Sequence, residues 1–505
     1  MNGIPILTLL TMLPVLGALI ALFSGRHARA VALATAVVGL ALTMEVWTHL
    51  PTDGSIGFIE HLAWVPSLGI EYHLGVDGLG ALMLVLSAIV TLMSVDAAHH
   101  VRHEPGLYFA LVLLLEAGLF GSFTALNFFH WFLFWELSLI PAFFLIKLWG
   151  GAKRGPAATQ FFVYTMAGSV VLLLAFLAVF LSTGSMDFLR LAAMASTGAL
   201  EAAVTAHIGP VMMWLAIGVL AGFAVKVPLA PFHTWLPAAY AEAPSPVTML
   251  LTGAMSKMGV YGLLRIALPL FGPQIAQIRT PLMVLAVITV VMGAWAAAAQ
   301  KDLKRVFAYS SVNHLGYCLL GIFAIAVPTV GAAAQTSQAA ALNGVILQMF
   351  NHGFTAAALF WFVAMMQLRS GGERGIDHFG GLRKPAPVFA GLMGIALFSS
   401  LGMPGLNGFV GEFLIFRGVF PLAWVAATIS VLGLLVTAAV ILTLIQKVFN
   451  GPVPEHCASF PDLHGGERLS MAPVIGLMIL IGLLPQLIVN SINPTVVNLL
   501  AHWRF

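Results

Sequence analysis

Six charged side chains lie inside long apolar stretches of this 505-residue chain: Glu116, Glu136, Lys226, Lys257, Arg265 and Glu412. A charge at the centre of a lipid bilayer costs about 2.5–3.5 kcal/mol on insertion scales, so each needs a partner or water. Burial disfavours the charged form of a lysine or a glutamate, and an opposite charge nearby favours it. A Glu136–Lys226 pair that forms and separates would therefore have a switchable proton affinity. Lys257 could then accept the proton, and Glu412 could pass it outward.

Three histidines in or beside apolar runs extend this series: His233, His314 and His352. Imidazole exchanges protons near neutral pH, which favours a proton path. The alternative for each histidine is a hydrogen-bonded structural role. The alternative for the buried charges is a set of ion pairs that lock helices together, with snorkelling near the helix ends.

Three other ionisable residues have no assigned part in proton movement. Arg265 keeps its proton in proteins, so we expect an electrostatic or structural role. Asp77 begins an apolar run, where a helix N-cap competes equally with any other function. Glu116 has the depth of a buried charge, but the sequence does not identify its partner.

Composition excludes several classes of protein. Hydrophobic residues make up 60% of the chain and charged residues only 8%, against about 25% charged in soluble domains. The net charge of +3 is too small to argue for nucleic acid. The two cysteines, Cys318 and Cys457, are too few for an Fe–S or structural zinc site, which takes about four Cys or His ligands. Because CxxC, GxGxxG, P-loop and HExxH patterns are also missing, we expect no metal and no cofactor on this chain.

Membrane-spanning helices must position the charged residues. About 20 apolar residues cross a hydrocarbon core of about 30 Å. Fourteen such runs lie near residues 4–24, 29–49, 76–98, 106–126, 127–149, 158–182, 210–240, 245–271, 281–299, 304–326, 339–368, 385–420, 421–448 and 471–492. The first run has neither a basic n-region nor a cleavage site, so we expect it to be retained. The sequence predicts an all-α polytopic membrane protein of about 14 transmembrane helices.

Basic residues are distributed unevenly between the loops. Loops after odd-numbered spans hold fourteen of them: Arg26, Arg29, Arg102, Lys153, Arg154, Lys301, Lys304, Arg305, Arg369, Arg374, Arg383, Lys384, Lys447 and Arg468. The other side holds only Arg190, Arg279, Arg417 and Arg504. The positive-inside rule then predicts that odd loops are cytoplasmic and that both termini lie outside.

Two spans carry helix breakers near their middle. Span seven contains residues 225–231 (Val-Lys-Val-Pro-Leu-Ala-Pro) and span twelve contains residues 402–408 (Gly-Met-Pro-Gly-Leu-Asn-Gly). Proline removes a backbone donor and clashes with the preceding turn, so both helices should break. Breaks five spans apart predict inverted repeats of helices 4–8 and 9–13, a layout from which transporters build a midplane path. The expected divisions are 1–105 for helices 1–3, 106–271 and 281–448 for the repeats, and 449–505 for a loop and helix 14.

Strings around these residues resemble the antiporter-like membrane subunits of proton-pumping NADH:quinone oxidoreductase (respiratory complex I), which are related to large subunits of multisubunit cation/proton antiporters. The strings are 134–136 (FWE), 226–237 (KVPLAPFHTWLP), 241–246 (AEAPSP), 256–262 (SKMGVYG) and 304–314 (KRVFAYSSVNH). The likeness runs from about span three to span thirteen. Residues 405–413 (GLNGFVGEF) resemble the subunit M type, which carries glutamate in span twelve where its sister subunits usually carry lysine.

The resemblance implies roles for individual residues. Glu136 and Lys226 match the family's key ion pair, and Lys257 matches its central lysine. Glu412 matches the outer residue. His314 and His352 match positions that the family uses between lysine and exit.

The resemblance also implies the setting of the chain. We expect one proton channel of a redox-driven pump in a bacterial inner membrane, with both termini on the periplasmic side. The expected partners are the lipid bilayer and other complex I membrane subunits, especially neighbouring antiporter-like subunits, and no nucleic acid. NADH, FMN, Fe–S clusters and quinone are expected in partner subunits.

Two alternative functions stay open. One is a subunit of a multisubunit Na⁺/H⁺ antiporter, against which Glu412 in place of lysine weighs. The other is the membrane arm of a related complex fed by ferredoxin, formate or hydrogen, because the electron donor would bind elsewhere. A purely scaffolding membrane protein would leave the six buried charges unexplained.

Overall fold

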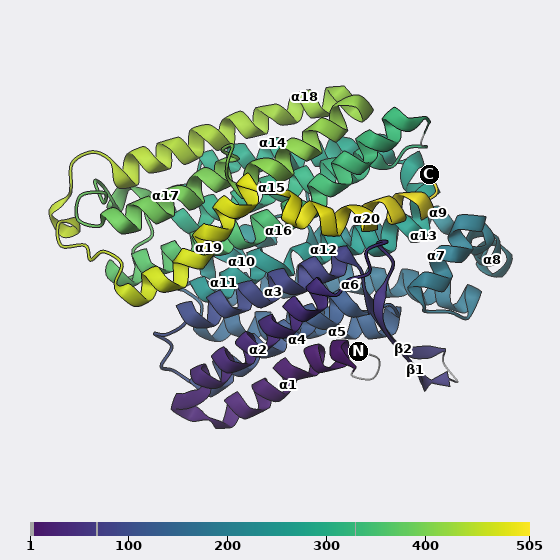
Figure 1. Ribbon diagram of the computed structural model, residues 1–505, viewed down its shortest axis with the longest axis horizontal. Helices are drawn as coiled ribbons and strands as arrows, with labels where there is room; N and C mark the ends of the chain where they lie inside the picture. The colour runs from purple at the N-terminus through teal and green to yellow at the C-terminus, as the bar shows by residue number, and fades with distance from the viewer. Residues whose placement is uncertain (1–4, 67–68, 329) are drawn as a thin grey trace.

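The computed structural model describes residues 5–66, 69–328 and 330–505 as an elongated bundle of helices that run roughly side by side (Figure 1). The first half contains α1 (Ile6–Phe23), α2 (Ala28–Thr48), β1 (Gly57–Val65), β2 (Ile70–Val76), α3 (Gly78–Ala97), α4 (Pro105–Thr124), α5 (Phe128–Trp149), α6 (Arg154–Thr183), α7 (Phe188–Thr197), α8 (Ala199–Ile208), α9 (Met212–Lys226), α10 (Trp235–Glu242), α11 (Ser245–Leu250), α12 (Lys257–Gly262) and α13 (Leu268–Gln277). The second half contains α14 (Arg279–Ala298), α15 (Leu303–Ile325), α16 (Ala332–Arg369), α17 (Pro387–Leu401), α18 (Asn407–Phe449), α19 (Gly465–Leu483) and α20 (Gln486–His502).

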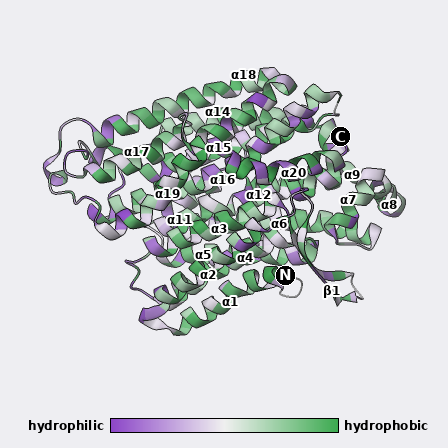
Figure 2. Cartoon of the chain, viewed as in Figure 1, coloured by the Kyte–Doolittle hydropathy of each residue, from purple (hydrophilic) through white to green (hydrophobic). Residues whose placement is uncertain are grey.

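The predicted all-α polytopic membrane fold is confirmed. Within the described residues, 12 helices are long and apolar enough to cross a membrane, or 13 if the bent pair α8–α9 forms one span. The central helices α15 and α16 are almost wholly buried, whereas α1, α2, α18 and α19 expose much of their apolar surface. Figure 2 shows hydrophobic residues along these outer helices and hydrophilic ones in the loops at the bundle ends. The outer helices therefore suit contact with lipid, and the buried charges lie inside.

One long helix accounts for part of the difference from fourteen spans. Helix α18 has 43 residues, roughly 64 Å at 1.5 Å per residue, which is twice the hydrocarbon thickness. Ala423 has non-helical φ −159° and ψ 63°, shortly after Pro421. Arg279, at the start of α14, donates a hydrogen bond of 3.0 Å to the Leu422 carbonyl, which fixes this turn at the edge of the bundle. Helix α18 therefore supplies two segments, as predicted for residues 385–420 and 421–448.

Both predicted helix breaks are present, between α9 and α10 and between α17 and α18. In the first break the Ala230 amide donates to Thr289 Oγ1 at 2.9 Å, near the middle of α14. At the second break the Asn407 carbonyl accepts a 2.7 Å hydrogen bond from Asn351 Nδ2. A neighbouring side chain thus satisfies a backbone amide that the first break releases inside the bundle, and a side chain of α16 holds the start of α18 at the second. The breaks fall in corresponding helices of the two predicted repeats, whose boundaries stay a prediction.

The helix that follows the first break is irregular. Two π-helical turns, η3 (Leu251–Met255) and η4 (Leu263–Ala267), flank α12. Such turns frequently occur at functional sites because they re-aim side chains. Here they frame Lys257, the first residue of α12.

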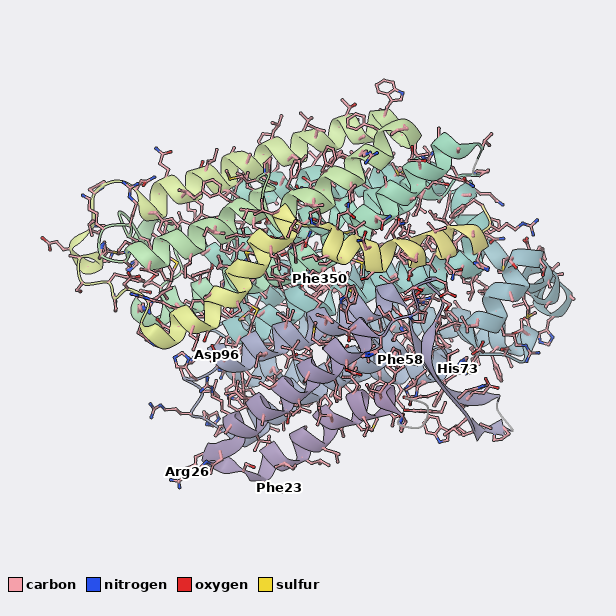
Figure 3. The ribbon with its side chains drawn as sticks, in the orientation of Figure 1. Phe23, Arg26, Phe58, His73, Asp96 and Phe350 are labelled. Carbon is pink, nitrogen blue, oxygen red and sulfur yellow. The ribbon has the colours of Figure 1, made fainter. Side chains whose placement is uncertain are left out.

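A β-hairpin between α2 and α3 was missed by the sequence prediction, which named no strands. Strands β1 and β2 pair antiparallel, and the hairpin lies with α7 and α8 at one end of the bundle (Figure 1). Helix α1 begins and α20 ends toward that same end. Figure 3 places Arg26 and Asp96 at the opposite end from Phe58 and His73.

Candidate functional site

Lys257 is fully buried and makes a direct contact with a histidine. Its Nζ donates to the Thr252 carbonyl oxygen and lies 3.4 Å from Ser256 Oγ. The same Nζ lies 2.8 Å from His352 Nδ1, which comes from α16. An ammonium group only donates, so His352 presents an unprotonated Nδ1 to a charged Lys257. This contact joins two groups that can exchange a proton.

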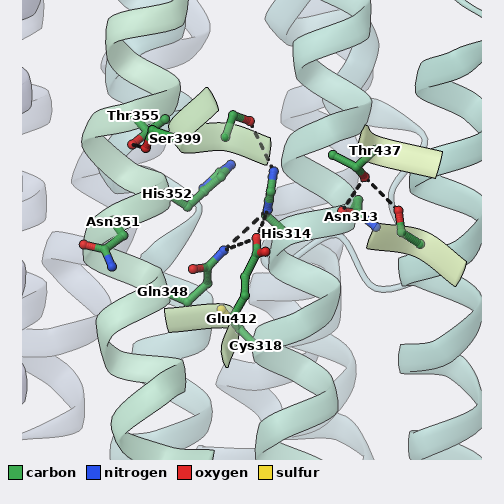
Figure 4. Close-up of polar contacts among 12 residues, drawn as sticks. Asn313, His314, Cys318, Gln348, Asn351, His352, Thr355, Ser399, Glu412 and Thr437 are labelled. Atoms are coloured by element: carbon green, nitrogen blue, oxygen red, sulfur yellow. Dashed lines mark hydrogen bonds and ion pairs between the residues drawn. The ribbon is translucent and has the colours of Figure 1, made fainter. Parts of the chain in front are cut away.

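His314 and Glu412 form a second buried pair (Figure 4). His314 Nδ1 lies 3.0 Å from Glu412 Oε1, and Gln348 Nε2 donates to that same oxygen at 3.2 Å. On its other side, His314 Nε2 lies 3.4 Å from Ser400 Oγ. The imidazole of His314 therefore stands between a carboxylate and a hydroxyl, with a polar contact at each nitrogen.

The two pairs meet through their histidines. The ring centroids of His314 and His352 are 5.1 Å apart, and the rings lie next to one another in Figure 4. A small ring rotation or one bridging water would join them, since water-mediated hydrogen bonds are nearly as good as direct ones. Lys257, His352, His314 and Glu412 thus form a buried series that crosses from α12 through α16 and α15 to α18. The structure brings together four of the seven predicted site residues.

Glu136 and Lys226 lie near each other but are not in contact. Lys226 is the last residue of α9, and its Nζ lies 4.6 Å from the centroid of the Trp135 ring, a cation–π distance. Both carboxylate oxygens of Glu136 are buried and have no hydrogen-bond partner among the described residues. The two charges interact electrostatically, yet no ion pair within 4.0 Å joins them in the described part of the chain. The site therefore holds this predicted pair in a separated arrangement.

Lys226 approaches the helix of Lys257 without reaching its side chain. A β carbon added at Gly259 of α12 would lie only 3.1 Å from Lys226 Cβ, so glycine allows α9 and α12 to pack closely there. No hydrogen bond joins the two lysines among the residues described. Transfer between them would need intervening water or side-chain movement.

His233 stands apart from the other site residues. It lies in the break between α9 and α10 and is half-buried. Its Nδ1 is buried and has no hydrogen-bond partner among the residues that the structure covers. The structure does not bring His233 into contact with the Lys257–Glu412 series.

The structure assigns local partners to the three residues whose roles were open. Asp77 Oδ1 accepts from the Gly80 amide at 3.1 Å and so caps α3, and its Oδ2 forms a 2.5 Å ion pair with Arg265. Glu116 is wholly buried on α4, with Thr91 of α3 as the neighbouring polar group. Asp77 and Arg265 are therefore paired with each other, and Glu116 makes no hydrogen bond to the series among the described residues.

Neutral polar residues of the site were missed by sequence reasoning. Gln348, Ser400 and Thr252 all contact the series, and none is distinctive among the many small polar residues of apolar helices. One signal existed for Gln348, because it precedes His352 by four residues and so shares its helix face.

Comparisons with known proteins identify the family of the chain. The family described as NADH:quinone oxidoreductase/Mrp antiporter, TM, matches residues 125–441. The chain is 33% identical to NADH-quinone oxidoreductase subunit M of Rickettsia typhi, over 99% of both chains. It is 34% identical to the subunit M of Rhodobacter capsulatus, over 95% of this chain and 91% of that one.

Solved structures share the fold along almost the whole length. A structure of respiratory complex I from Thermus thermophilus with bound NADH contains a chain that matches with TM-score 0.86 and 27% identity, over 99% of this chain and 100% of that one. A structure of the Mrp complex from Dietzia sp. matches with TM-score 0.81 and 22% identity, over 98% of this chain and 97% of that one, which shows the fold alone. Since the family match covers more than half of the sequence and relatives align over nearly all of it, the chain belongs to the NADH:quinone oxidoreductase/Mrp antiporter membrane family.

Proposed function

We propose that this chain is the subunit M type of antiporter-like membrane subunit in a bacterial NADH:quinone oxidoreductase. Its site moves protons through the buried series from Lys257 to Glu412. The observation that carries this proposal is the run of short contacts Lys257–His352, His314–Glu412 and the two adjacent imidazole rings. Two broken helices flank this run, as expected for a midplane transport path.

The series supports stepwise transfer. Lys257 gives a proton to His352 Nδ1 across 2.8 Å, and the imidazole can release a proton from its other nitrogen. His314 takes the proton after ring movement or through water, and passes it to Glu412 Oε1 at 3.0 Å. Each step then joins groups that both bind and release protons.

The Glu136–Lys226 pair acts as the loading control. In the separated arrangement Lys226 is held over Trp135 and Glu136 has no hydrogen-bond partner among the described residues, so either side chain can move without breaking a strong contact. Approach of Glu136 favours a charged Lys226, and withdrawal favours release of its proton. Proton release from Lys226 then loads Lys257.

The driving energy comes from outside this chain. Moving one charge across the membrane costs about 2.3 kcal/mol per 100 mV, and a relay supplies none of it. NADH, FMN, Fe–S clusters and quinone are assigned to partner subunits, with no redox site on this chain. Neighbouring antiporter-like subunits transmit the coupling as a change at the Glu136–Lys226 pair.

The orientation belongs to the same proposal. Both termini face the periplasm, and the loop with Arg26 faces the cytoplasm. The charge asymmetry supports this assignment by the positive-inside rule. In Figure 1, α1 begins and α20 ends toward the same end of the bundle, as expected for a chain that crosses the membrane an even number of times.

The substitution His352→Gln tests the relay. Glutamine keeps polarity and bulk but cannot carry a proton, and acid–base groups typically contribute about 10²-fold or more to a transfer step. The complex reconstituted in liposomes should pump far fewer protons per NADH oxidised, and a pH-sensitive dye measures this ratio. His49→Gln, at an exposed histidine of the α2 end, is the matched control. An unchanged ratio in His352→Gln, or sodium transport in place of proton transport, would contradict the proposal.

A further inference from the structure

Three side chains of metal-binding type gather on the β1–β2 hairpin at one end of the bundle: His61, Glu71 and His73. In the antiparallel ladder His61 pairs directly with His73, and Ala63 pairs with Glu71. Residues directly opposite one another point to the same face, as do residues two apart on one strand. The backbone register alone therefore places all three side chains together.

The distances within this cluster are short. One ligand atom from each residue lies within 4.8 Å of the others. His61 Nε2 lies 3.1 Å from Glu71 Oε2, and the two imidazole rings stack with centroids 4.4 Å apart. Ligand atoms around a tetrahedral zinc lie roughly 3.4 Å apart, given Zn–N bonds of about 2.0–2.1 Å. Rotation of the exposed His61 and Glu71 side chains would bring the three ligand atoms, now within 4.8 Å of one another, to the separation that zinc requires.

His73 is already oriented by a carboxylate. Its Nδ1 lies 2.5 Å from Asp187 Oδ2, and both side chains are nearly buried. Asp187 Oδ1 also accepts a 2.8 Å hydrogen bond from the Arg190 amide, so the carboxylate is itself fixed at the start of α7. A carboxylate behind a histidine fixes the ring and leaves the second nitrogen for a metal ion.

A simple surface ion pair does not explain this arrangement. The exposed His61–Glu71 contact alone would contribute about 0–1 kcal/mol. The pair His49–Glu45, at the C-terminal end of α2, is an example of a simple surface ion pair. Its His49 Nδ1 and Glu45 Oε1 lie 3.2 Å apart, and both side chains are exposed. The hairpin differs because a third ligand, His73, is buried beneath the pair and has its own carboxylate partner.

We propose that His61, Glu71 and His73 form a binding site for a divalent cation of the zinc class, with Asp187 positioning His73. Two imidazoles and a carboxylate are a common three-ligand zinc set that leaves a fourth position for water. No metal site is predicted from the sequence, because the spacing 61, 71 and 73 matches no motif until the hairpin forms.

A bound ion would connect separate parts of the fold. It would join β1 to β2, and through Asp187 it would tie the hairpin to the first turn of α7. Strand β1 is also tethered to α1, since Glu60 Oε1 accepts from the Leu7 amide at 2.8 Å. The ion would therefore brace the N-terminal helices against the first predicted repeat, at the end of the bundle that carries His73 in Figure 3.

Zinc titration of the purified complex tests the site. Complex stripped with a chelator is titrated with Zn²⁺ against a chromophoric competitor, as wild type and as the variants His61→Ala, Glu71→Gln, Asp187→Asn and His49→Ala. We expect one Zn²⁺ equivalent that His61→Ala and Glu71→Gln lose and His49→Ala keeps. Asp187→Asn should weaken binding by about 10–100-fold, as for other residues behind a metal ligand.

The exposed positions of His61 and Glu71 keep the test independent of folding. X-ray absorption of the bound ion should report imidazole and oxygen ligands. Wild type that binds no more zinc than His61→Ala would overturn the site. Equal binding by wild type and Asp187→Asn would overturn the positioning role of Asp187.

Discussion

The two halves of the molecule hold their buried carboxylates in opposite ways. In the first half, Glu136 has buried oxygens with no hydrogen-bond partner in the described part of the chain, and Lys226 rests over Trp135. In the second half, Glu412 contacts both His314 and Gln348. The first half therefore contains a loosely held carboxylate on the unbroken helix α5, and the second half contains a fixed one on α18, after the second break.

The difference indicates a division of labour. A charge without a fixed partner changes its surroundings when a helix moves slightly, which suits control of loading. A carboxylate held by donors has a defined proton partner, which suits passage. We infer that the Glu136–Lys226 pair responds to coupling and that the series from Lys257 to Glu412 conducts.

The largest expected effect follows from Glu136→Gln. This change keeps the side-chain size but removes the charge that Lys226 senses. A tenfold change in proton affinity corresponds to about 1.4 kcal/mol, so we expect proton pumping to fall by about tenfold or more. Proton uptake by liposomes containing the complex measures it, with Glu45→Gln at an exposed glutamate of α2 as control. Pumping at the level of that control would remove the proposed switch.

The second-largest effect is a difference in stability between a variant of the second half, Glu412→Ala, and a variant of the first half, Glu136→Ala. Glu412→Ala leaves His314 and Gln348 without their buried acceptor, and breaking such a pair costs about 3–5 kcal/mol. Glu136→Ala breaks no such contact and should cost about 1 kcal/mol. The temperature at which the purified complex disassembles measures both variants. Equal losses would show that the two carboxylates are held alike.

A moderate effect is expected from Gln348→Ala. Glu412 then loses one donor but keeps His314, so its position becomes less fixed. Loss of one hydrogen bond of about 1 kcal/mol would slow transfer roughly fivefold. Initial pumping rates measure this, and Gln335→Ala, at an exposed glutamine of the same helix, is the control. A pumping rate equal to that of the control would show that Gln348 does not help to position Glu412 for proton transfer.

The smallest effect concerns how the broken spans begin. Asp462 accepts from the Val388 and Phe389 amides at 3.1 and 2.8 Å and so holds the start of α17, whereas α9 has no side-chain cap. Burial opposes ionisation of Asp462, but these backbone hydrogen bonds, with that of Leu463, lower its pKa. Asp462→Ala should cost about 0.5–1 kcal/mol of stability at pH 7.

The pH dependence of that variant follows from the lowered pKa. The contribution of Asp462 to the free energy of unfolding is fully present above the pKa of about 3.9 that an aspartate has in the unfolded chain. It is lost as pH falls through the lower pKa that Asp462 has in the folded chain. Denaturation of the purified chain at several pH values would check this. A difference between wild type and Asp462→Ala that grows in acid would contradict it.

Local signals explain what was predictable from the sequence. Apolar runs of about 20 residues locate the spans, and Pro228, Pro231 and Pro404 locate the breaks, because both effects act within a few residues. Pro421 also marks the turn inside α18. The residues of the Lys257–Glu412 series came from buried charge, helical histidines and family resemblance.

Long-range contacts explain what was not predictable. Lys257 and His352 are 95 residues apart, and no local rule fixes which turns of α12 and α16 face each other. The separation of Glu136 from Lys226 likewise depends on how α5 and α9 pack. The β1–β2 hairpin was missed because its two short strands lie between helices, so the clustering of His61 with His73 could not be anticipated.

The most direct test removes the proton-carrying group from the start of the series. Lys257→Met keeps a long side chain of similar reach but cannot bind a proton, and Lys147→Met, at an exposed lysine of α5, is the matched control. The number of protons moved per NADH oxidised is measured in liposomes containing each complex. The account predicts a much lower ratio for Lys257→Met than for Lys147→Met. Equal ratios in the two assembled complexes would contradict a relay through Lys257.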